Sequence, residues 1–331
     1  MADSPPCRSA AQAAPAGGEL GRGPAVGALA LLILVWGYNW IIMKTATGYA
    51  GPFDFAALRS VLGTVFLFAA LLALGRRLKP PPLAPTVLLG LAQTAGFTGL
   101  SQWALVAGGA GKTAVLAYTM PFWTLLLAAW LLDERIRGMQ WLAVVLALAG
   151  LILVLEPWRL QGTLESGLLA VGSGLAWAAG AIVVKRLQAR QRTDSLVLTA
   201  WQMLFGSLLL VVLALAVPQP PVRWTGAFVA LLLYISLVGT AAAWFAWIFV
   251  LKRLPAGTAS LGILAVPVIG VLASALQLGE RPSGPELWGM VSIMGALALL
   301  TLHGLSLSAR QAGRGPGERK DPPGSPPGQN E

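Results

Sequence analysis

The chain has 331 residues, of which 56% are hydrophobic and only 11% are charged, and its formal net charge is +10. Water-soluble domains carry about 25% charged residues, so this composition, with a mean hydropathy of +0.72, excludes a soluble globular protein. The apolar runs are continuous and about 20 residues long, as in membrane-spanning helices and unlike the alternating strands of an outer-membrane barrel. The sequence therefore predicts an all-α integral membrane protein.

Apolar segments separated by short connections rich in Gly, Pro and charge predict ten transmembrane helices. In chain order we expect them at 25–44, 53–74, 84–106, 111–132, 138–155, 165–187, 195–217, 224–250, 257–278 and 285–306. The two flanking segments, 1–24 and 307–331, are rich in Pro, Gly and polar or charged residues, and we expect both to be disordered tails.

The distribution of basic residues indicates the orientation in the membrane. If the N-terminus is cytoplasmic, the cytoplasmic segments hold most of the 23 Lys and Arg residues, as the positive-inside rule requires. We therefore expect both termini in the cytoplasm. This topology and attraction to anionic lipid explain the net charge, so a nucleic-acid partner is not needed.

The second half of the chain repeats the first. Three pairs of segments match: WGYNWIIMK with WAAGAIVVK (36–44 and 177–185), ALRSVLG with AWQMLFG (57–63 and 200–206), and AGKTAVLAYTMPFWTLLLAAWLLDER with AGTASLGILAVPVIGVLASALQLGER (110–135 and 256–281). The pattern predicts two five-helix repeats, 25–155 and 156–306. Because five is odd, the second copy enters the membrane from the opposite side, which is a construction typical of secondary transporters.

The same segments resemble the EamA-like family of the drug/metabolite transporter superfamily. The resemblance rests on WGYNWIIMK, on the early Arg of PFDFAALR and on the helix AVLAYTMPFWTLLLAAWLLDERI, with second copies in LAWAAGAIVVKRL and ASLGILAVPVIGVLASALQLGERP. It covers nearly all of 25–306 and implies ten helices around a central cavity. It also implies bacterial export or exchange of small metabolites, often amino acids. Gln202 stands where the second copy would repeat Arg59.

Polar and aromatic side chains inside the apolar segments are candidates for lining a substrate cavity, because unpaired polar groups in lipid are costly. They are Trp36, Tyr38, Asn39, Gln93, Trp103, Tyr118, Thr119, Trp177, Trp244 and Trp247. Hydrogen bonding between helices and aromatic packing are the alternative explanation for each of them. Gln93 and Gln102 do not share one helix face, so we expect at most one of them to face inward.

Two prolines and one arginine stand out within the predicted spans. Pro121 and Pro267 lie midway along matched helices, where each frees a backbone carbonyl. They predict either a hinge or substrate site, or a kink that neighbouring helices tolerate. Arg59 lies well inside its helix, where a charge is rare. It is either the counter-ion of a substrate carboxylate or a side chain that snorkels to the surface and pairs with Asp54.

Several classes of function lack the residues they require. Cys7 is the only cysteine and His303 the only histidine, which excludes a disulfide framework and cysteine or histidine metal clusters. We expect no cofactor and no metal. The sequence has no Walker-type phosphate loop and no recognisable nucleophile–base set, so an enzyme is disfavoured. No Asp or Glu lies deep in a predicted span, so no carboxylate proton relay is visible.

The sequence therefore predicts a secondary transporter in the bacterial cytoplasmic membrane. It would move a small organic metabolite by alternating access around an aromatic-rich central cavity, and the family resemblance implies export and an amino acid or similar substrate. A non-transporting receptor or scaffold on the same fold is the alternative. The sequence leaves open whether the chain forms a homo-oligomer.

Overall fold

The computed structural model describes residues 22–136, 138–158, 163–191, 193–254, 259 and 262–313, and these residues form helices and connections without a strand. The all-helical prediction is thus confirmed for this part of the chain. The tails predicted over 1–24 and 307–331 lie largely outside it. Their described portions, 22–24 and 307–313, belong to the first and last helices.

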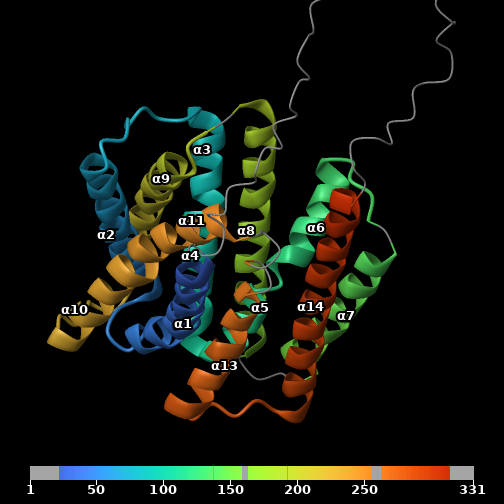
Figure 1. Cartoon of the computed structure of the whole chain (residues 1–331). Coiled ribbons are helices and arrows are strands. Elements are labelled where there is room, and N and C mark those ends of the chain that lie inside the picture. The colour runs from blue at the N-terminus through green and yellow to red at the C-terminus, as the bar shows by residue number, and fades with distance from the viewer. Residues whose placement is uncertain are drawn as a thin grey trace, which may run out of the picture.

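The helices follow the predicted order closely (Figure 1). The first half contains α1 (Arg22–Ala46), α2 (Pro52–Ala73), α3 (Leu83–Leu89), the π-helix η1 (Gly90–Gly96), α4 (Phe97–Ala107), α5 (Ala110–Ala117), α6 (Met120–Leu131) and α7 (Met139–Leu155). The second half contains α8 (Thr163–Arg190), α9 (Ser195–Ala216), α10 (Gly226–Leu233), the π-helix η2 (Tyr234–Ala242), α11 (Ala243–Arg253), α13 (Ala265–Gln277) and α14 (Gly284–Gly313).

Among the described residues, eight helical segments are long and apolar enough to cross a membrane. They are Gly23–Ala46, Pro52–Ala73, Leu83–Ala107, Ala110–Leu131, Leu164–Arg190, Ser195–Ala216, Gly226–Arg253 and Gly284–Ser306. Two further apolar helices, α7 and α13, are shorter. The protein is therefore a multi-pass membrane protein, and the number of ten spans stays a prediction.

The two halves share local features that the sequence repeat did not specify. Each contains one π-helical segment, η1 or η2, at the same place in the third helix of its repeat. Each also ends its proline-containing helix in the same way. The backbone N–H of Glu134 donates to the carbonyl of Ala128, and that of Glu280 donates to the carbonyl of Ser274, both at 3.3 Å. The matched sequences therefore form matched structures.

Pro121 lies beside a break in a segment that the sequence predicted as one helix. α5 ends at Ala117, Tyr118 and Thr119 form a turn, and α6 begins again at Met120 with the proline in its first turn. Proline is tolerated in a first turn because its missing N–H would have no helical partner there. Pro267 likewise lies in the first turn of α13, after a turn at residue 264.

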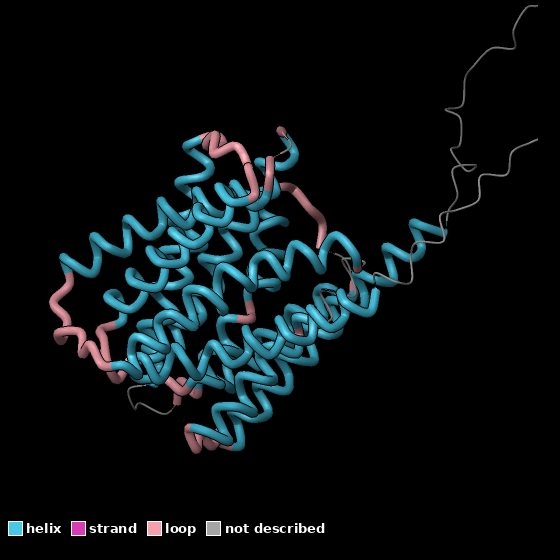
Figure 2. Tube along the Cα trace, turned by 60° about the vertical axis from the view of Figure 1, so that its left-hand side comes forward, coloured by secondary structure: helices cyan, strands magenta, loops and turns pink. Residues whose placement is uncertain are grey.

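The helices form a bundle whose connections lie mainly at the helix ends (Figure 2). Some of these helices come into close backbone contact. α7 and α14 pack side by side at one edge of the molecule (Figure 1). An ideal Cβ on Gly150 would lie 2.7 Å from the carbonyl oxygen of Gly289, and one on Gly289 would lie 2.6 Å from that of Gly150. Small residues at such contacts are what hold helices together where lipid surrounds them.

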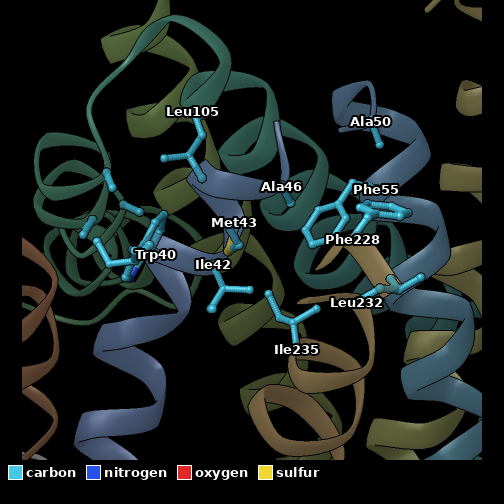
Figure 3. Packing of buried hydrophobic residues seen from close by; sticks show 14 residues of the cluster. Trp40, Ile42, Met43, Ala46, Ala50, Phe55, Leu105, Phe228, Leu232 and Ile235 are labelled. Atoms are coloured by element: carbon cyan, nitrogen blue, oxygen red, sulfur yellow. The ribbon is translucent and has the colours of Figure 1, made fainter. Parts of the chain in front are cut away.

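Buried apolar side chains pack together near the end where α1 finishes (Figure 3). We call this group the α1-end cluster, and its members come from α1, α2, α4, α5, α10, η2 and the α1–α2 connection: Trp40, Ile41, Ile42, Met43, Ala46, Ala50, Phe55, Leu105, Ala110, Ala114, Ala117, Phe228, Leu232 and Ile235. Every member is at most 8% exposed. The cluster therefore seals one end of the space between the two halves.

Candidate substrate cavity

A cavity of about 340 Å³ lies between the two halves and takes side chains from both. Of the predicted candidates, seven line it: Trp36, Asn39, Gln93, Tyr118, Trp177, Trp244 and Trp247. Arg59 lines it as well, and Gln102 does not, so one glutamine of that pair faces inward. Residues far apart in the sequence are thus brought to one cavity.

Three predicted candidates lie off the cavity. The hydroxyl of Tyr38 donates to Oε1 of Gln277 at 3.0 Å. Trp103 is 41% exposed and packs edge-on against Phe53. The hydroxyl of Thr119 donates to the carbonyl of Leu116 at 2.6 Å, so its polar group is used within the α5–α6 turn. None of the three lies among the lining residues.

The lining residues of α1 follow the helical period. Trp36, Asn39, Trp40 and Met43 are spaced by three, one and three positions, so they share one face, and all four line the cavity. Tyr38 lies off this face. Trp40 and Met43 were not among the predicted lining residues, although their spacing from Trp36 and Asn39 indicates the same helix face.

Asn39 combines both explanations that the sequence left open. Its Nδ2 donates to the carbonyl of Gly239 in η2 at 3.4 Å, and Nε1 of Trp36 donates to the same carbonyl at 3.3 Å. These bonds tie α1 to η2. The other amide atom, Oδ1, is buried without a hydrogen-bond partner. Asn39 therefore joins two helices and still offers an acceptor.

Aromatic rings form two groups around the cavity. The ring of Trp36 lies 6.5 Å from that of Trp244 and 6.0 Å from that of Trp247, measured between centroids. On another side, Phe97 and Trp177 lie edge to face at 4.9 Å. These separations are typical of stabilising aromatic pairs. The cavity is thus lined by two aromatic groups, one from α1 and α11 and the other from α4 and α8.

Arg59 of α2 contributes a cationic side chain to the lining of the cavity. Within the described part of the chain it makes no salt bridge and no hydrogen bond, so the alternative in which it pairs with Asp54 is not observed. Gln202 of α9 also lines the cavity, and its Oε1 is buried without a hydrogen-bond partner, as is Oδ1 of Asn39. The cavity lining thus includes one cationic side chain without a partner and two amide residues whose carbonyl oxygens are buried and unpaired.

The cavity is unequally closed at its two ends. Trp40 and Met43 are only 4% and 5% exposed and belong to the α1-end cluster. Trp36, Trp244 and Trp247, which lie toward the opposite end, are half-buried. The described residues therefore close the space at the end where α1 finishes and leave more access toward the other end.

No described part of the chain gathers three or more His, Cys, Asp or Glu side chains where they could hold a metal ion. Arg59, Asn39 and Gln202 contribute a guanidinium and two amide groups to the lining, and these are not a nucleophile with its base. The arrangement is suited to holding a small molecule that has a negative group and hydrogen-bond donors.

A family model described as the EamA-like transporter family matches residues 24–156 and again 166–302. The transporter YoaV of Bacillus subtilis, called uncharacterized, is 29% identical over 254 residues, or 75% of this chain and 86% of that protein. A probable amino-acid metabolite efflux pump of Salmonella typhimurium is 28% identical over 288 residues, covering 82% and 93%. The uncharacterized protein PA1977 of Pseudomonas aeruginosa is 33% identical over 259 residues, covering 78% and 87%.

A solved crystal structure, described only as that of a protein, has the same fold. Its TM-score is 0.60 at 24% sequence identity, and the match covers 86% of this chain and 99% of that one. The likeness extends over nearly the whole of the other chain and supports the helical architecture.

Proposed function

Because the chain belongs to the EamA-like transporter family and is a multi-pass membrane transporter, not an enzyme, we propose that it moves a small organic metabolite by alternating access around the central cavity. The membrane is the bacterial cytoplasmic membrane, and the direction is export. The name of one relative, a probable amino-acid metabolite efflux pump, supports this direction and an amino acid as the substrate.

We propose ten spans, arranged as two inverted five-helix repeats with both termini in the cytoplasm. The matched family model, the two π-helical segments and the matched ends of α6 and α13 support the repeat. With 17 residues, α7 is at the short limit for a span, so counting it is consistent with its length. The basic residues of the predicted cytoplasmic segments support the orientation.

The observation that carries the proposal is the set of unpaired polar groups in an aromatic cavity. A volume of about 340 Å³ suits a small metabolite. A zwitterionic amino acid has a carboxylate for the guanidinium of Arg59 and an ammonium group for the amide oxygens of Asn39 and Gln202, which are buried without a partner and would turn toward the ligand. Its side chain would then lie against the tryptophans of α1 and α11.

Pro121 and Pro267 are proposed as the hinges. Each stands where a helix restarts, and residues beside both restarts, Tyr118, Met120 and Ile263, line the cavity. A helix that is already broken can change direction without losing further backbone hydrogen bonds. Movement at these points would therefore change the cavity directly.

Thiol labelling tests the proposal in protein carrying Cys7→Ser and one new cysteine, at Trp177 or Trp244 in the cavity or at Trp103 outside it. We expect amino acids to block labelling at the two cavity positions and to leave the Trp103→Cys control unchanged. Flux of the protecting amino acid in proteoliposomes completes the test. Protection without flux would indicate the receptor or scaffold, and absence of any protection would refute the cavity assignment.

A further inference from the structure

The connection between α4 and α5 cannot cap its own helix ends, because it consists of Gly108 and Gly109. The last carbonyls of α4 are instead bound by Lys44 of α1, whose Nζ donates to the carbonyl of Leu105 at 2.7 Å and to that of Gly108 at 2.9 Å. A cation at a helix C-terminus is electrostatically favourable. Lys44 belongs to the first half of the chain, whereas Ser166 of α8, whose hydroxyl donates to the carbonyl of Ala104 at 2.8 Å, belongs to the second.

The start of α5 is capped by the second half of the chain. The carboxylate of Glu280, in the α13–α14 connection, accepts the backbone N–H of Ala110 at 2.7 Å through Oε1 and that of Gly111 at 3.1 Å through Oε2. Both are charge-assisted hydrogen bonds, and the anion faces the positive end of the helix dipole. A single side chain thus joins the two halves through two bonds.

This contact lies at the sealed end of the cavity. Ala110, which Glu280 caps, belongs to the α1-end cluster, as does Leu105, which Lys44 caps. Glu280 itself is half-buried, so its carboxylate could return to water when it leaves the helix. The carboxylate forms charge-assisted hydrogen bonds while it is bound and is hydrated by water when it is released, so the contact is suited to being reversible.

The counterpart of Glu280 in the first half is in a different environment. Glu134 occupies the matching position and has the same backbone hydrogen bond six residues back. Its side chain is nevertheless exposed and pairs with Lys185 of α8. Within the described residues, it accepts no backbone N–H at a helix start. The two carboxylates are therefore equivalent in sequence and unequal in the structure.

We propose that Glu280 is a latch for the α1-end of the cavity: its carboxylate holds the start of α5 while this end is closed, and releases it when this end opens. The inference rests on the proposed alternating access. Since the halves must separate at this end for a substrate to leave there, the two bonds of Glu280 must break in each cycle, as must other contacts that cross there, such as the ion pair of Lys112 with Glu286. Glu280 is a positioning residue and does not touch the substrate.

The test uses the full chain with Cys7→Ser and Met43→Cys, a reporter at the sealed end of the cavity. In the parent, a membrane-impermeant thiol reagent added on the side of the α13–α14 connection should label this cysteine slowly. Glu280→Gln removes the charge, and Glu280→Asp is too short to reach both amides. We expect each variant to increase the labelling rate about tenfold, which corresponds to about 1.4 kcal/mol.

Two further variants separate a latch from a general loss of folding. Gly109→Ala leaves the charge intact but places a Cβ 2.8 Å from Oε2 of Glu280, so we expect a smaller increase in labelling. Glu134→Gln is the matched control at the other copy; it removes the pair with Lys185 and no bond to the start of α5, so it should not increase the rate. Unchanged labelling in all the Glu280 and Gly109 variants, or an equal increase in Glu134→Gln, would overturn the latch.

The same preparations distinguish failure of the latch from failure of the proposed function. In the parent with cysteine at Trp244, amino acids should block labelling whether or not Glu280 is a latch. If this protection is present and the reporter at Met43 does not respond, only the latch is wrong. If this protection is absent, the proposed function is wrong.

Discussion

Replacing Arg59 by Gln should selectively weaken binding of substrates that carry a carboxylate. The guanidinium lines the cavity and has no hydrogen bond or salt bridge within the described residues. Its removal therefore leaves no other buried charge without a partner, and the loss of affinity measures the interaction with the ligand itself. This simplicity is uncommon for an arginine within a membrane protein.

The expected loss follows from the kind of bond that is removed. Hydrogen bonds to charged groups contribute about 1.5–3 kcal/mol net. The side chain of Arg59 is half-buried in a cavity that water can enter, so we take about 2 kcal/mol, which corresponds to a roughly 30-fold weaker binding of the carboxylate. Arg59→Lys keeps the charge without the planar fork and should lose less.

The assay is quenching of tryptophan fluorescence by added ligands, because several tryptophans line the cavity. Each amino acid is compared with its carboxamide. In the parent the carboxylate form should bind more tightly, and in Arg59→Gln the two forms should bind about equally. If Arg59→Gln keeps the parent's preference for the carboxylate, the guanidinium is not its counter-ion and the reasoning fails.

Two further predictions concern packing and movement. Gly239→Ala would place a Cβ 2.6 Å from the side chain of Asn39. It should lower the unfolding free energy, followed by thermal unfolding, by about 1–3 kcal/mol. The control Gly172→Ala meets nothing closer than 3.6 Å and should be neutral or stabilising in the same measurement. An ideal Cβ on Gly111 lies 2.6 Å from Oγ of Ser274, so cysteines at these two positions should form a disulfide on oxidation. The disulfide should stop transport, and a reductant should restore transport. Continued flux in the oxidised protein would contradict movement of α5 against α13.

The helices could be predicted from the sequence because continuous apolar runs and their breakers determine them directly. The break between α5 and α6 could not be placed, since Pro121 only indicates that a hydrogen bond is missing and Tyr118 and Thr119 do not reveal the turn. The π-helical segments η1 and η2 left no sequence signal that we recognise. They depend on packing between helices and not on local propensity.

The cavity was predictable where helical spacing applied, and was missed where long-range contacts decide. Trp36 and Asn39 share a face of α1, and the structure places both on the lining. Trp103 and Thr119 were equally polar or aromatic by sequence, yet one packs on Phe53 and the other bonds within its own turn. Which face of a helix points inward depends on its neighbours, and one sequence does not supply them.

Matching positions in the two halves carry different side chains in the cavity, which suits a substrate with two different polar groups. Arg59 and Gln202 occupy matching positions in the repeat, and the structure brings both to the same cavity. An arginine in each copy would give two cationic groups in one apolar space, an environment suited to a substrate with two negative groups. One arginine and one glutamine instead provide a cation and a neutral acceptor. A molecule with one carboxylate and one ammonium group complements this pair, so the departure of Gln202 from the repeat itself favours a zwitterion.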